Sequence, residues 1–101
     1  MKKLTTVTLL ALTSTGVWAN ADLAKKNNCL ACHAVDKKLV GPAYQDVAKK
    51  YAGQADAEAT VAKNIKAGGS GKWGPIPMPP QTQLSDADAK ALAVWVLGGA
   101  K

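Results

Sequence analysis

The stretch Cys29-Leu30-Ala31-Cys32-His33 carries the most specific signal in this sequence. Cysteines at positions i and i+3 lie on the same face of one helical turn. Two thiols on one face can add to the two vinyl groups of one porphyrin, and the next residue is then close enough for its imidazole to reach the iron. Because Cys-x-x-Cys-His is the attachment pattern of c-type haem, the stretch predicts one covalently bound haem, with the histidine as an axial ligand.

Other chemistries remain open for a Cys-x-x-Cys pair. A dithiol oxidoreductase of the thioredoxin kind requires a βαβ pattern around the motif, and the sequence shows none. A zinc site requires four ligands, and His33 is the one additional strong donor near the cysteines. A disulfide between residues this close closes a very small loop and contributes little stability. The haem interpretation is therefore preferred over a dithiol or zinc module.

Met78 is the predicted second axial ligand of the iron. The sequence has one His, and Met78 is the only Met after Met1. It stands between Pro77 and Pro79, in a segment where prolines fix φ and remove backbone donors, so that the chain is extended and stiff. Such a segment offers a side chain with little conformational entropy left to lose. Ligation by Met and His raises the reduction potential of a haem.

A Gly41-Pro42 pair follows the haem motif. A ligating histidine usually donates its other ring N–H to a carbonyl or a carboxylate, which fixes the ring. The Pro42 carbonyl is a candidate acceptor for the His33 ring. A plain turn at this position is equally compatible with the spacing.

The first residues have the order of a secretory signal peptide. Met1-Lys2-Lys3 is positively charged, residues 4–13 are uncharged and apolar, and small residues follow. The apolar run is too short to span a bilayer, so we expect residues 1–19 to be a removed signal peptide and residues 20–101 to be the functional domain. Cleavage after Ala19 is preferred, although cleavage after Ala21 also leaves a small residue. The alternative is an amphipathic N-terminal helix of the folded domain.

Composition and spacing predict one small all-α domain. The chain has 101 residues, 48% of them hydrophobic, and 13 basic residues against 7 acidic ones. This length allows one domain, and two close cysteines exclude a disulfide scaffold. Helical spacing of apolar residues occurs at about 22–33, 43–51, 56–67 and 86–97. Ser85 is a good N-cap for the last helix. Residues 68–84 form a long loop, and loops of this length in small domains are commonly functional.

Four segments together resemble the short bacterial class I cytochromes c. They are the haem motif, Val40-Gly41-Pro42-Ala43-Tyr44, residues 73–80 and the helix at residues 92–97. The resemblance is to the small periplasmic type that donates electrons in nitrite respiration and to terminal oxidases or peroxidases. It implies about four short helices wrapped around one haem c. It also implies His33 and Met78 as axial ligands and the Pro42 carbonyl as ring partner.

The resemblance implies further haem contacts and shows two departures. The Trp73 indole N–H is expected to reach a haem propionate. Five residues are expected to pack on or near the haem: Leu39, Val40, Tyr44, Tyr51 and Trp95. Asn64 stands where some relatives carry a basic residue that contacts a propionate. Gln81 stands where some have Asn near the Met ligand, so both changes bear on the reduction potential.

The expected function is outer-sphere electron transfer by a monomeric carrier, not enzyme catalysis. With both axial positions filled by protein, the iron has no open site for a substrate, and the cofactor supplies the redox chemistry. Lysine pairs at 25/26, 37/38 and 49/50, with Lys72, are expected to ring the haem edge and steer acidic redox partners into transient contact. Nucleic-acid binding and stable membrane insertion are not expected. The rival class is a haem enzyme or gas sensor with an open sixth position.

Overall fold

The computed structural model describes residues 16–101, and most of the predicted signal peptide lies outside them. The described residues form four α-helices and one short 3₁₀ helix, η1, without any strand. The elements in chain order are α1 (Gly16–Lys26), η1 (Cys29–Ala31), α2 (Tyr44–Tyr51), α3 (Ala57–Ala67) and α4 (Asp86–Leu97). The predicted all-α class is therefore confirmed. The preferred cleavage bond after Ala19 falls within α1.

The helix predicted at about 22–33 has the wrong limits. α1 starts earlier and ends at Lys26, and the cysteines belong to the separate turn η1. Asn28 separates the two with a φ of 61°, in the left-handed region that Asn tolerates better than most residues. The Leu23 carbonyl near the end of α1 accepts both the backbone N–H of Asn27, at 3.1 Å, and its side-chain amide, at 2.8 Å.

The other three helices agree with the prediction to within one residue. α2 and α3 begin directly after Ala43 and Asp56, and α3 ends before Gly68. α4 begins after Ser85, whose Oγ accepts the Asp88 backbone N–H at 3.0 Å. This is the expected cap, and the two acidic residues in the first turn of α4 complement the positive end of its dipole.

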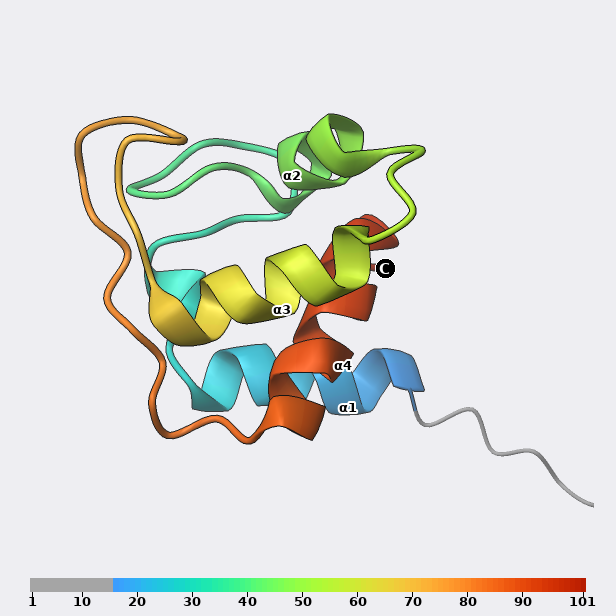
Figure 1. The fold of residues 1–101 in the computed structure, drawn as a ribbon. Helices are drawn as coiled ribbons and strands as arrows, with labels where there is room; N and C mark the ends of the chain where they lie inside the picture. The colour runs from blue at the N-terminus through green and yellow to red at the C-terminus, as the bar shows by residue number, and fades with distance from the viewer. Residues whose placement is uncertain (1–15) are drawn as a thin grey trace, which may run out of the picture.

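The buried core centres on α4, which packs against α1, α2 and α3 (Figure 1). Ala24 on α1 and Ala93 on α4 are fully buried, and their small side chains allow these helices to approach closely. The remaining buried members of the cluster are Tyr44, Val47, Tyr51, Ala57, Val61, Leu84, Leu92, Trp95 and Val96. This core occupies one side of the molecule.

Two long connections cover the other side. The segment between η1 and α2 and the loop 68–84 both arch away from the helices, and the tip of the loop comes beside α2 (Figure 1). Within the described part of the chain, no helix combines the length and hydropathy that crossing a lipid bilayer requires.

Candidate functional site

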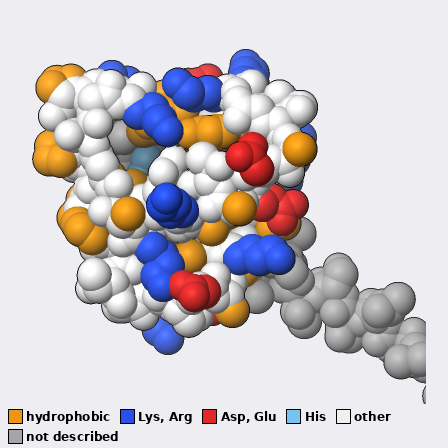
Figure 2. All heavy atoms as spheres, in the orientation of Figure 1, with side chains coloured by type: hydrophobic (Ala, Val, Ile, Leu, Met, Phe, Trp, Pro, Cys, Tyr) orange, Lys and Arg blue, Asp and Glu red, His pale blue; other side chains and the backbone are white. Residues whose placement is uncertain are grey.

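A cavity of about 530 Å³ lies beneath the two connections. Its volume is within the range of about 300–1,000 Å³ that is typical of cofactor pockets. Apolar side chains of the helices line its inner side: Val47, Val61, Ile65 and Val96. Figure 2 shows the single histidine of the chain inside a hollow on this face. Of the predicted site residues, the cavity wall contains Cys32, His33, Pro42, Trp73 and Met78.

The His33 ring is held by a hydrogen bond to the backbone. Its Nδ1 lies 2.8 Å from the Pro42 carbonyl oxygen. A carbonyl only accepts hydrogen bonds, so the proton must be on Nδ1 and the lone pair on Nε2. A neutral imidazole in this tautomer offers Nε2 as a metal ligand, and the carbonyl fixes the ring orientation.

Packing fixes the same ring from two further sides. A Cβ at Gly41 would lie 2.8 Å from Nδ1, so only glycine leaves room for the ring here. The Tyr44 ring stacks on the imidazole at a centroid distance of 5.1 Å and an angle of 20°. Trp95 then meets Tyr44 edge-on at 5.3 Å. Burial raises the pKa of Tyr44 above its ordinary value, so this phenol stays neutral.

The five residues expected on or near the haem occupy two places. Leu39 and Val40 line the cavity. Tyr44, Tyr51 and Trp95 lie behind its wall, in the buried core. From there they position residues of the wall, and the stacking of the imidazole on Tyr44 has no signal in the sequence.

The two cysteines are adjacent but differently placed. In η1 the Cys32 and His33 N–H groups both donate to the Cys29 carbonyl, at 3.2 and 3.0 Å. In a 3₁₀ turn, side chains at i and i+3 eclipse, so both thiols are on one face. Cys32 lines the cavity, whereas Cys29 is half-buried beside the core. Both are free thiols. Burial raises the pKa of the Cys29 thiol, which disfavours thiolate-based dithiol chemistry.

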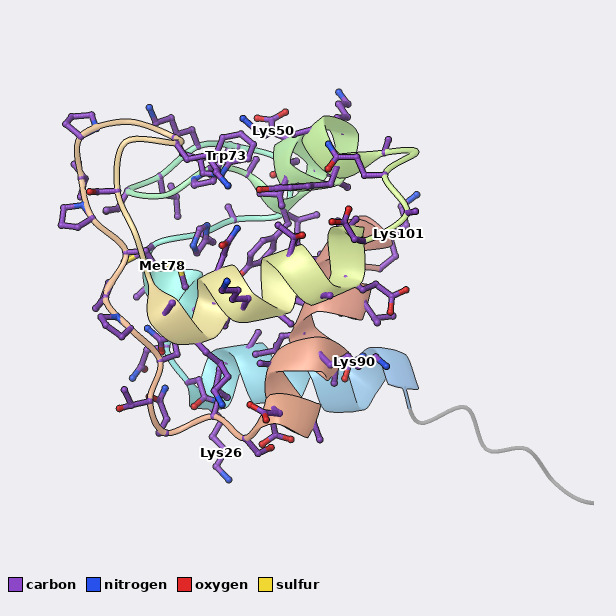
Figure 3. The ribbon with its side chains drawn as sticks, viewed as in Figure 1. Lys26, Lys50, Trp73, Met78, Lys90 and Lys101 are labelled. Carbon is purple, nitrogen blue, oxygen red and sulfur yellow. The ribbon has the colours of Figure 1, made fainter. Side chains whose placement is uncertain are left out.

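Backbone hydrogen bonds fix the position of Met78 at the end of α3. Met78 and Gly69 exchange a pair of backbone hydrogen bonds at 2.7 and 3.0 Å. Directly after Pro79-Pro80, the Gln81 N–H donates to the Lys66 carbonyl at 3.1 Å. Figure 3 shows Met78 on the descending part of the loop, beside the C-terminal end of α3. The proline-rich loop is therefore bound to the residue pair after α3 at Met78 itself, and to the last turn of α3 at Gln81.

Gly68 makes this close approach possible. Its φ of 68° and ψ of −168° lie in a region that only glycine commonly occupies. A Cβ there would lie 2.7 Å from the Pro80 nitrogen and 2.9 Å from the Pro79 carbonyl carbon. Gly53 also has a positive φ, 79°, but no atom lies within 4 Å of the place of its Cβ. Gly53 therefore carries positive-φ strain without a clash, whereas Gly68 combines a glycine-only backbone conformation with a close approach of the loop.

We expect Gly68→Ala to destabilise the protein more than Gly53→Ala. Gly53→Ala should lower the free energy of unfolding by roughly 1–2 kcal/mol through positive-φ strain. Gly68→Ala should lower it by about 1–3 kcal/mol more, because its backbone conformation is restricted to glycine and the methyl group also displaces the loop. Urea unfolding of the holoprotein measures both. Only Gly68→Ala should also weaken the far-red absorption band of Met–Fe(III) coordination, and equal effects of the two variants would contradict this role of Gly68.

The tip of the loop makes two contacts with α2 that the sequence reasoning missed. Lys50 Nζ lies 4.9 Å from the centroid of the Trp73 ring, within the range of a cation–π interaction. Lys72 Nζ donates to the Tyr51 hydroxyl oxygen at 3.2 Å. Neither pair has a signal in sequence spacing, since the partners are more than twenty positions apart and belong to different elements.

The two departures from the resembled family have different surroundings. Asn64 is half-buried on α3 and lines the cavity. Gln81 donates from Nε2 to the Pro79 carbonyl at 3.0 Å and accepts from Gln83 at 2.8 Å. Gln81 thus contacts the backbone one residue beyond Met78, and Asn64 presents an uncharged side chain to the cavity.

The cavity fits a haem by its own chemistry. It combines an apolar inner wall with one oriented imidazole, one thioether sulfur and one free thiol next to a second. In residues 16–101, no three His, Cys, Asp or Glu side chains gather into a group that could hold a metal ion.

These features define a small all-α protein of the c-type haem class. The chain belongs to the Cytochrome c family, whose model matches residues 19–99. It is 63% identical to cytochrome c-552 of Nitrosomonas europaea over 79 residues, which are 78% of this chain and 77% of that protein. It is 54% identical to cytochrome c-551 of Pseudomonas aeruginosa, over 96% of this chain and 97% of that protein.

A solved structure shows the same fold. The crystal structure of wild-type Nitrosomonas europaea cytochrome c552 superposes with a TM-score of 0.76 at 62% identity, and covers 78% of this chain and 98% of that one. The protein is therefore a small electron-carrier cytochrome c with one covalent haem c, and it is not an enzyme.

Proposed function

We propose that the residues of the cavity hold the haem in the way their geometry suggests. Cys29 and Cys32 form the thioethers, and His33 Nε2 and Met78 sulfur are the axial ligands. The single observation that carries this assignment is a cavity shared by Met78 and a His33 ring whose Nδ1–H is bound to the Pro42 carbonyl. The Trp73 N–H is proposed to donate to a haem propionate.

This assignment favours electron transfer over the open-site alternative. The bound haem supplies one-electron Fe(II)/Fe(III) chemistry. The chain's own residues hold the proton on His33 Nδ1, keep Met78 hydrogen-bonded to Gly69 and exclude water with the apolar inner wall. A gas sensor or haem enzyme would need Met78 to leave, and the two hydrogen bonds to Gly69 oppose that movement.

We propose that redox partners dock on the open side of the cavity. Leu39, Val40 and Ile76 line it and are exposed by 44%, 48% and 61%, so apolar surface surrounds the opening. Lys38 and Lys72 lie in the same wall. Lys26, however, projects at the opposite end of the molecule from Lys50 (Figure 3), so the expected lysine ring does not include every pair. Small transient interfaces of this kind suit electron transfer.

The proposed role is to carry electrons between respiratory partners in the periplasm, after export by the N-terminal signal. A nitrite reductase, a terminal oxidase and a cytochrome c peroxidase are the candidate acceptors. The relatives named cytochrome c-551 and c-552 support the carrier function. The choice among the three acceptors is left to the experiment that follows.

Stopped-flow oxidation of the reduced holoprotein by each candidate acceptor tests the docking surface. Val40→Ser should slow the reaction about fivefold, because truncating one central interface side chain costs on the order of 1 kcal/mol. Val94→Ser is the matched control, since Val94 is 44% exposed on α4 but does not line the cavity. Raising the salt concentration should slow the reaction of both variants with an acidic acceptor. Equal rates for the two variants would place docking elsewhere.

A further inference from the structure

The tip of the loop 68–84 is fastened to the end of α2 by two lysine–aromatic contacts, which we name the clasp. One joins Lys72 to the Tyr51 hydroxyl and the other places Lys50 over the Trp73 ring. Figure 3 shows Lys50 and Trp73 together where the loop tip reaches α2. Lys72 and Trp73 also line the cavity, so the clasp forms part of its wall.

The two lysines of the clasp have no acidic partner. All seven acidic residues lie in the described part of the chain. Within residues 16–101 the one ion pair joins Lys66 to Asp86, outside the cavity wall. Tyr51 is only 6% exposed, so its hydroxyl is a fixed acceptor for the Lys72 ammonium group. The Lys72 ammonium group is thus fixed in place at the cavity wall without a negative charge beside it. Such a group favours the binding of an anionic part of the cofactor.

Haem c carries two carboxylate side chains. None of the α3 residues that line the cavity is positively charged. Asn64 is the polar side chain that α3 contributes to this wall, and it is uncharged. We propose that Lys72, positioned by the Tyr51 hydroxyl, is the counter-cation of one haem carboxylate. The charge at this edge of the haem then comes from the loop tip and not from α3. This inference rests on the proposed function, since it requires the haem to occupy the cavity.

A lysine at this place affects the pH dependence of the reduction potential. An ionised carboxylate favours ferric iron, so the potential falls as pH rises through the carboxyl pKa. A lysine beside the carboxylate keeps that pKa low, and its removal should raise the pKa by about 1–3 units. The other charged or titratable side chains of the wall are Cys32, His33 and Lys38. Tyr51 and Lys50 lie beside it in the clasp, and none of these five groups changes in a Lys72 variant.

Redox titration of the holoprotein over a range of pH tests the proposal. In Lys72→Gln, the pH at which the potential falls should move upward by about one unit or more relative to the wild type. Lys38→Gln is the matched control, because Lys38 also lines the cavity but is not in the clasp. Tyr51→Phe keeps the charge but frees the ammonium group, so it should give a smaller upward shift.

The outcomes separate this inference from the proposed function. Covalent haem and the far-red Met band are measured first in the wild type, and their absence there would overturn the proposed function. If both are present and Lys72→Gln has the same profile as the wild type or as Lys38→Gln, Lys72 is not the counter-cation. If Lys72→Gln shifts and Tyr51→Phe does not, the positioning role of Tyr51 is wrong.

Discussion

Met78→Ala is expected to keep its covalent haem, lose the far-red Met–Fe(III) band and have a lower reduction potential. Axial ligands set haem potentials over a span of about 0.8 V, so a decrease on the order of 0.1 V is expected when the thioether is lost. Thioether ligation favours Fe(II), which gives the direction. The vacated axial position should bind carbon monoxide in the reduced form. Spectroelectrochemical titration and carbon monoxide spectra measure these three changes.

Two further variants separate ligation from packing. Met78→Leu nearly keeps the apolar volume and removes the sulfur, so it should behave like Met78→Ala if Met78 binds iron. Ile76→Ala shortens an exposed side chain in the same loop and should leave the spectrum unchanged. If Met78→Ala retains the wild-type spectrum and potential, the ligand assignment is wrong.

Local patterns predicted the parts of this fold that depend on local chemistry. Ser85 and the acids after it fixed the start of α4, because a cap is a contact between residues a few positions apart. The same reasoning failed at the first helix. Asn28 breaks it with a left-handed backbone, a conformation that Asn permits but does not require.

The candidate site was predictable to the extent that its residue types are chemically distinctive. A Cys-x-x-Cys-His run and a methionine between prolines stand out in any sequence. The contacts that position these residues do not stand out, because they join residues far apart in the sequence. The stacking of Tyr44 on His33, and the bond from Lys72 to Tyr51, depend on how α2 is placed against two connections.

The glycines of the site show why the residues that position a ligand are harder to predict than the ligand itself. Gly41 and Gly68 leave room for the His33 ring and for the prolines after Met78. A glycine in a sequence predicts a turn, but it does not say which atom uses the space of the missing side chain. The proposed haem ligands are therefore held at the site by residues whose function is visible only in three dimensions.

The double variant Cys29→Ala, Cys32→Ala is expected to lose covalent attachment of the haem completely. Acid extraction followed by pyridine haemochrome analysis should find the haem in the solvent fraction, whereas in the wild type it stays with the protein. Leu30→Ala is the matched control, because Leu30 stands between the two cysteines and is 37% exposed, and it should retain covalent haem. Haem that stays with the double variant after extraction would contradict the attachment sites.

Loss of the thioethers should also make the melting temperature of the protein depend on the concentration of haem. Val47, Val61 and Val96 belong to the buried core and also line the cavity of about 530 Å³, so a haem seated there would extend the core. An attached haem remains with the chain at any dilution. A haem held without covalent bonds stabilises the native state by mass action, so the melting temperature of the double variant should rise with added haem and that of the wild type should not. A melting temperature of the double variant that ignores added haem would show that the haem does not complete the core.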